Sequence, residues 1–204
     1  MRLSNAQKVY AIEPVDQARS EVYDFLAALL AKPADQNFLD NIKSLEGDDN
    51  SIGERLGTLA KLARVATPED VEREFNTLFI GLGRGELLPY ASYYLTGFLN
   101  EKPLAKLRGD MALFGVERAE DKKEPEDNIA SLMEMMGGFI VGRFGRVVDE
   151  AEQRRFFSTH LAPWAGLFFK DLESSKNSVF YAGVGALGRT FIEIEEEAFR
   201  MSAN

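Results

Sequence analysis

The chain has 204 residues, of which 45% are hydrophobic, and carries a formal net charge of −9. This length and hydrophobic content allow a substantial buried core. The acidic balance argues against a protein that coats nucleic acid, because duplex binding requires clustered Lys and Arg.

Two residue types that build reactive centres are almost absent. The chain has no cysteine and a single histidine, His160. Disulfides, thiolate metal sites, cysteine nucleophiles and histidine-rich metal centres are therefore excluded. We expect no catalytic residue, no metal ion and no cofactor.

The sequence also argues against a membrane segment. Residues 1–15 lack the apolar region of a secretory signal. The most apolar stretch, residues 129–142, contains Glu134 and is shorter than the ~20 residues that a bilayer-spanning helix needs. We expect a soluble cytoplasmic protein without stable membrane insertion.

Apolar residues recur with helical spacing along the whole chain, and no segment alternates as a strand does. The sequence thus predicts an all-α fold: a single globular domain, residues 1–204, with roughly eight to ten helices. In chain order, the apolar faces cover residues 22–30, 38–45, 52–62, 71–79, 104–114, 129–140, 156–161, 163–172 and 179–199.

Several helix ends carry recognisable signals. Thr67 can cap the helix that Pro68 begins, and Gly115 can close the helix over 104–114. The glycines in the segment GLGRG, residues 81–85, predict an end to the preceding helix and a loop after it. The charged segment 117–128 is interpreted as a linker.

The same glycine-rich segment raises the possibility of a nucleotide site. A dinucleotide fingerprint needs a strand before the glycines and a helix after them. Here a helix precedes, and Leu-Leu-Pro follows at 87–89. Nucleotide binding therefore stays only as the alternative function, and the aromatic loop 87–94 is the better candidate for a peptide groove.

Several segments, in order, resemble the TorD/DmsD family of redox-enzyme maturation chaperones. They are Phe-Asn-Thr-Leu-Phe-Ile-Gly at 75–81, Leu-Pro-Tyr-Ala-Ser-Tyr-Tyr-Leu at 88–95, Glu-Pro-Glu-Asp-Asn-Ile-Ala at 124–130 and His-Leu-Ala-Pro-Trp at 160–164. The second is similar to the family's P-Y-x-S-x-Y-L segment and the third to its E-P-E-D-H segment. The resemblance spans about residues 15–198.

The resemblance implies a helical cytoplasmic chaperone that is not an enzyme. Such proteins bind the twin-arginine leader of an apo-molybdoenzyme catalytic subunit, delay its export and prepare it for insertion of the molybdenum cofactor. The family's motif positions correspond here to Leu78, Phe79, Pro89, Tyr90, Ser92, Glu124, Asp127 and Asn128. Asp127 is the expected partner of a leader arginine, and the aromatic loop the expected apolar wall.

Each of these positions also has a purely structural interpretation. Leu78 and Phe79 lie on an apolar helix face and fit a core, and Asp127 can cap the following helix. Asn128 stands where the family usually has histidine. Asparagine can form hydrogen bonds but does not titrate near neutral pH, so a role that needs a protonated imidazole is not expected here.

Overall fold

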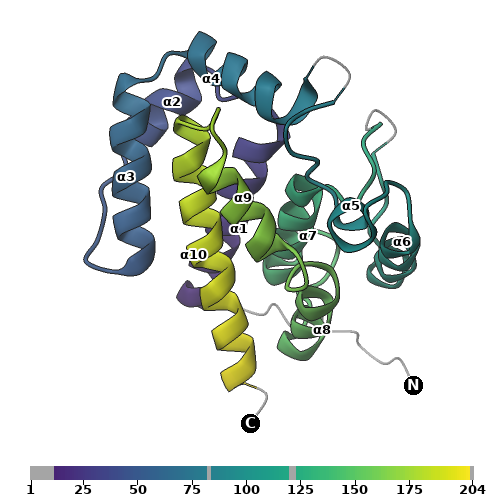
Figure 1. Cartoon of the computed structure of the whole chain (residues 1–204). Coiled ribbons are helices and arrows are strands. Elements are labelled where there is room, and N and C mark those ends of the chain that lie inside the picture. Colours follow the sequence, from purple (N-terminus) through teal and green to yellow (C-terminus); the bar gives the residue numbers. More distant parts are fainter. Residues whose placement is uncertain (1–11, 82–83, 120–122, 203–204) are drawn as a thin grey trace, which may run out of the picture.

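A computed structural model describes residues 12–81, 84–119 and 123–202. Throughout these residues the regular elements are helical, which confirms the all-α prediction (Figure 1). The α-helices are α1 (Pro14–Ala31), α2 (Gln36–Lys43), α3 (Ser51–Val65), α4 (Pro68–Phe75), α5 (Ala91–Thr96), α6 (Lys102–Phe114), α7 (Ile129–Val141), α8 (Glu150–His160), α9 (Ala165–Ser174) and α10 (Phe180–Met201), and the π-helix η1 (Asn76–Ile80) continues α4.

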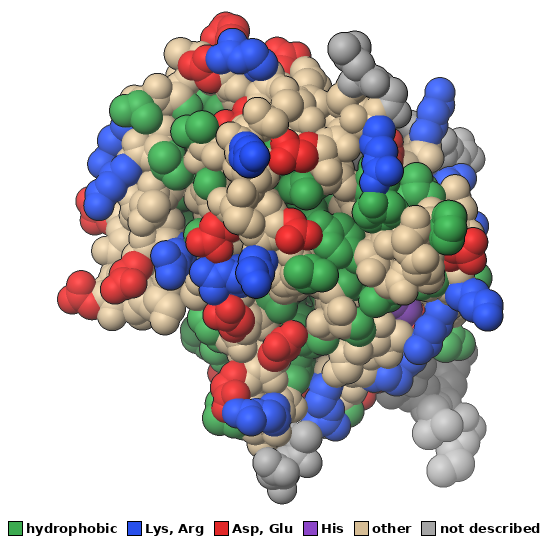
Figure 2. Space-filling view, in the orientation of Figure 1, with side chains coloured by type: hydrophobic (Ala, Val, Ile, Leu, Met, Phe, Trp, Pro, Cys, Tyr) green, Lys and Arg blue, Asp and Glu red, His purple; other side chains and the backbone are tan. Residues whose placement is uncertain are grey.

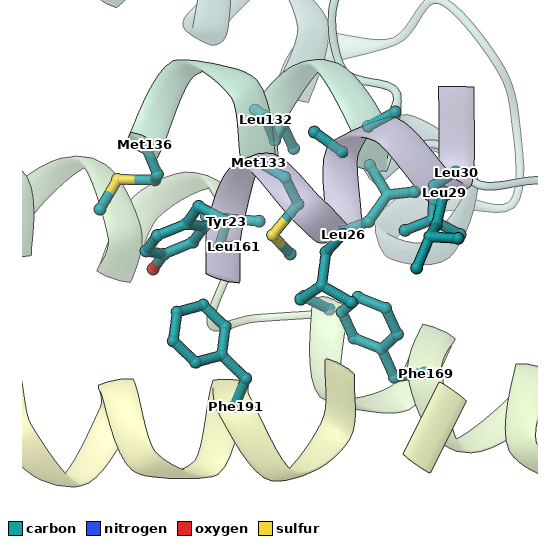
Figure 3. Packing of buried hydrophobic residues seen from close by; sticks show 14 of the residues in the cluster. Tyr23, Leu26, Leu29, Leu30, Leu132, Met133, Met136, Leu161, Phe169 and Phe191 are labelled. Atoms are coloured by element: carbon teal, nitrogen blue, oxygen red, sulfur yellow. The ribbon is translucent and has the colours of Figure 1, made fainter. Parts of the chain in front are cut away.

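The first helix lies at the centre of the core, between α7 and α10. Its side chains Tyr23 and Leu26 are fully buried, with Met133 of α7 on one side and Phe191 of α10 on the other (Figure 3). The ring of Tyr23 meets that of Phe191 edge to face, with the centroids 4.7 Å apart. The apolar stripe of α1 therefore joins the middle of the chain to its last helix.

A buried ionic group fixes α1 against α10. Arg19 donates to both carboxylate oxygens of Glu195 at 2.8 Å, and the hydroxyl of Tyr23 donates to the same carboxylate at 2.9 Å. Burial and then the charge of Glu195 raise the pKa of Tyr23, so it remains a donor. The full hydrogen bonding of Glu195 compensates for its removal from water.

The helices α9 and α10 approach closely because α10 carries glycines on the contact face. A Cβ atom built on Gly188 would lie 2.2 Å from the ring of Phe169, and one on Gly185 would lie 2.5 Å from the backbone of Glu173. Both distances are too short for any side chain. This contact holds α9 against α10, and Trp164, just before α9, packs against Tyr94 of α5.

Several helix boundaries follow the sequence signals, and two segments differ from what the sequence predicts. Thr67 caps α4, and Gly115, with φ of 69°, ends α6. The segment after Pro89 was expected to be a loop, but it forms the short helix α5. The expected linker 117–128 ends in two buried carboxyl groups, of Glu126 and Asp127. Both departures create the site described next.

Within the described ranges, no helix is both long and apolar enough to cross a membrane.

Candidate functional site

Two segments that are more than thirty residues apart meet in an isolated antiparallel bridge. Tyr90 pairs with Asn128, so the segment 87–92 lies alongside 124–129. Backbone hydrogen bonds of 3.0 and 2.9 Å flank the pair. The structure thus brings together six of the eight positions expected to form the site, those in these two segments.

Asp127 lies beneath this bridge and holds the start of α5. Its side chain is 1% exposed, and its Oδ2 accepts hydrogen bonds from the backbone N–H of Ser92, at 2.8 Å, and from the Ser92 hydroxyl. Its Oδ1 is buried and has no hydrogen-bond partner among the described residues. In this arrangement Asp127 presents no exposed oxygen to an arginine from outside, and its visible contacts are those of a helix cap.

Glu124 is the accessible carboxylate of the site. It is exposed, and its Oε2 accepts a hydrogen bond from the hydroxyl of Tyr90. Burial, followed by this hydrogen bond and the charge of Glu124, raises the pKa of Tyr90, which therefore stays protonated. Among the described residues only one oxygen of Glu124 accepts a hydrogen bond, and the other faces no described donor.

Asn128 and Glu126 complete the second segment. The side chain of Asn128 accepts from the backbone N–H of Ala130 at 2.9 Å and so caps α7. Burial alone would raise the pKa of Glu126, but hydrogen bonds from Arg108, at 2.8 and 3.1 Å, and the charge of Arg118 lower it. Glu126 was not singled out in the sequence, where it looks like one more acidic residue of a charged run.

Leu78 and Phe79 lie outside the bridge and belong to the core. Leu78 is fully buried in η1, and the half-buried Phe79 packs its ring against those of Phe75 and Tyr181, with centroids 4.9 and 5.6 Å away. The carbonyl of Leu78 accepts from the N–H of Leu87 at 2.8 Å. Leu78 and Phe79 therefore form part of the core on which the loop from residue 84 to residue 90 rests.

The glycine-rich segment gives the chain room to fold back on η1. Gly81 has φ of 63°, a conformation that favours glycine. Gly85 is buried, and a Cβ atom there would lie 2.4 Å from the carbonyl carbon of Phe79. Residues 82 and 83 lie outside the described part. The described glycines, Gly81 and Gly85, allow the chain to pack closely against η1.

An apolar surface adjoins the bridge. Leu95 at the end of α5 is 43% exposed, and Phe98 and Leu99 just after it are 70% and 41% exposed. Figure 2 shows hydrophobic side chains gathered between α9 and α5. Leu167 of α9 is exposed as well. The site therefore combines an accessible carboxylate with an uncovered apolar area.

A half-buried tyrosine joins α5 to α9. The hydroxyl of Tyr94 donates to Asp171 at 3.1 Å, and its ring lies 5.3 Å from that of Trp164. Trp164 in turn donates its indole N–H to the carbonyl of His160 at 2.8 Å. These contacts fix α5, and thus the bridge, to the core.

Metal binding finds no support in the described residues. Across 12–81, 84–119 and 123–202, no group of three His, Cys, Asp or Glu side chains is placed to hold a metal ion. The carboxyl groups of 124, 126 and 127 diverge to Tyr90, Arg108 and Ser92 respectively.

Comparisons with known proteins identify the family of the chain. A family model described as nitrate reductase delta subunit matches residues 45–170, more than half of the chain. The chaperone protein TorD of Vibrio atlanticus (strain LGP32) is 29% identical over 203 residues, which cover 89% of this chain and 94% of that protein. The chaperone protein TorD of Vibrio parahaemolyticus is 27% identical, over 90% of this chain and 95% of that protein.

A solved structure shows the same fold. It is the crystal structure of a proposed redox enzyme maturation protein from Archaeoglobus fulgidus, with a TM-score of 0.57 and 19% sequence identity over 92% of this chain and 99% of that one.

Fold and sequence matches together define a helical maturation chaperone of redox enzymes, a role without catalysis of its own. The chain belongs to the nitrate reductase delta subunit family, which includes the TorD chaperones. Its general function is accordingly the maturation of a molybdoenzyme.

Proposed function

We propose that this chain is a cytoplasmic chaperone that binds the twin-arginine leader of an apo-molybdoenzyme catalytic subunit, delays export of that subunit and assists insertion of the molybdenum cofactor. The whole chain, residues 1–204, acts as one helical domain. The observation that carries the proposal is the bridge between Tyr90 and Asn128, because it places an exposed carboxylate next to an exposed apolar surface.

The chemistry of a twin-arginine leader matches these two features. Its arginines carry positive charge, and an apolar stretch follows them. The exposed carboxylate of Glu124 suits a guanidinium group, which can donate two parallel hydrogen bonds, and Leu95 and Phe98 suit apolar side chains. The net charge of −9 would speed the approach of a basic peptide.

The motif residues divide into contact and support roles in this proposal. Glu124 and Tyr90 face the leader. Pro89, Ser92, Asp127 and Asn128 hold the two segments in register, and Leu78 and Phe79 support the loop from the core.

Calorimetric titration tests the proposal. Synthetic leader peptides of the molybdoenzymes encoded in the same genome are titrated into the protein, each beside a version with both arginines replaced by lysine. We expect saturable binding to at least one leader, and weaker binding of its lysine version, because lysine cannot make the two-pronged contact.

Matched variants of the protein complete the test. Glu124→Gln is expected to weaken binding about tenfold, which corresponds to about 1.4 kcal/mol for one charge-assisted contact. Glu196→Gln, an exposed glutamate of α10, serves as the control. Absence of binding to every leader would refute leader recognition, and pull-down of whole apo-enzymes would then test recognition of the mature subunit.

A further inference from the structure

A groove lies between α1, α7 and residues 116–119 and 124–126. It encloses about 440 Å³ and includes Glu124, the accessible carboxylate of the bridge site. Ala28 and Ala31 form its wall on α1 and are exposed, whereas Met111 and Met135 on the opposite side are buried. We call this the α1–α7 groove.

The apolar part of the groove suits side chains of varied shape. Small alanine side chains on α1 leave the hollow open. Methionine side chains are flexible and polarizable, so they adapt to different apolar partners. Such a surface accepts an apolar segment without demanding one sequence.

The rim of the groove is acidic. It carries five carboxyl groups and two guanidinium groups, a balance of −3. Asp24 pairs with Arg143, and Glu126 pairs with arginines. The salt bridges among the described residues leave three carboxyl groups without a cationic partner, those of Glu117, Glu124 and Glu134.

The groove has a direction. Ser20 of α1 donates to the carbonyl of Gly137 at 3.0 Å, so the early part of α1 lies beside the later part of α7. Along α7 the lining runs from Ala130, which follows the Glu124–Glu126 segment, to Arg143 and Phe144 just after the helix, where Arg143 pairs with Asp24.

Glu124 thus has two apolar areas to choose between, the exposed one at Leu95 and Phe98 and the α1–α7 groove. We propose that the groove holds the apolar segment of the leader, with the leader's arginines at the Glu124 end and the apolar residues running along α1 toward Phe144. This inference rests on the proposed function. The occupant follows from complementarity: unpaired carboxylates at one end match the arginines, and the alanine and methionine lining matches the residues after them.

The first test fills the groove. Ala28→Trp places an indole in the hollow at an exposed helical position. We expect affinity for the bound leader to fall at least tenfold, with unchanged helical content. Ala151→Trp, an exposed alanine of α8 away from the groove, is expected to bind as the unaltered protein does.

A charge reversal on the rim gives a second, independent measurement. Glu134→Lys is expected to weaken binding of the arginine-containing leader about tenfold and to reduce its salt dependence. Glu196→Lys, on α10, changes the net charge by the same amount and controls for the effect of overall charge on binding of the leader.

Cross-linking locates the peptide directly. The chain has no cysteine, so Ser131→Cys in the groove and Ser158→Cys on α8 each provide a unique thiol. With a leader that carries a bromoacetyl group in its apolar segment, we expect adducts with Ser131→Cys and none with Ser158→Cys.

The outcomes separate this inference from the proposed function. If the unaltered protein binds a leader, while Ala28→Trp binds it equally well and Ser131→Cys forms no adduct, the groove is refuted and leader recognition stands. A disulfide-linked dimer of Ser131→Cys without peptide would instead assign the groove to a second copy of the chain. If no leader binds at all, both fail.

Discussion

Replacement of Asp127 tests whether this motif residue touches the leader or holds the site together. Asp127→Ala removes the acceptor of two hydrogen bonds from Ser92, one of them from a buried backbone N–H. Loss of the bonds and the unsatisfied N–H together cost about 2–4 kcal/mol in free energy of unfolding. For a chain of this size, 3 kcal/mol lowers Tm by roughly 6–12 °C.

Urea unfolding measures this loss, and leader titration of the same protein measures its effect on binding. Asp127→Asn keeps an amide oxygen facing Ser92 and is expected to lose less than half as much stability. Ser92→Ala combined with Asp127→Ala should cost less than the sum of the single changes, because the two side chains act as one unit. Unchanged stability of Asp127→Ala together with lost leader binding would overturn the positioning role and assign Asp127 to the leader arginine.

Two further predictions concern the core. Gly188→Ala is expected to destabilise the fold by about 1–3 kcal/mol because its Cβ would meet Phe169. Gly109→Ala, on an open face of α6, should instead raise the free energy of unfolding by about 0.5–1 kcal/mol. Equal effects of the two changes in thermal unfolding would contradict the close contact of α9 and α10. Burial lowers the pKa of His160 despite its hydrogen bond with Asp110. The unfolded chain then takes up the proton first as the pH falls, so the free energy of unfolding should decrease below about pH 6.5. His160→Gln should remove this part of the dependence of stability on pH.

The fold was largely predictable because its helices carry strong local signals. The apolar period of 3.6 residues located α1, α3, α6, α7 and α10, and Thr67 and Gly115 marked helix ends that the structure confirms. The short helix α5 was missed. Its six residues are too few for a periodic pattern, and it is stabilised by the distant carboxyl group of Asp127.

The candidate site could be named from the sequence but not assembled from it. Family resemblance selected the two segments, whereas their bridge depends on the long-range pairing of Tyr90 with Asn128. The accessibility of Glu124 and the burial of Asp127 are likewise tertiary properties. Glu134 was visible only as a lone charge in an apolar helix, which says nothing about the groove it borders.

The position of α1 has a consequence for synthesis on the ribosome. Arg19 and Glu195 are 176 residues apart in sequence. At about 5–20 residues per second, roughly 9–35 s separate their emergence. During that interval the buried face of the first helix has no α10 to cover it. The newborn chaperone itself is therefore exposed to aggregation until its last helix is made, and a nascent chain stalled before α10 would need the protection that the finished protein gives to others.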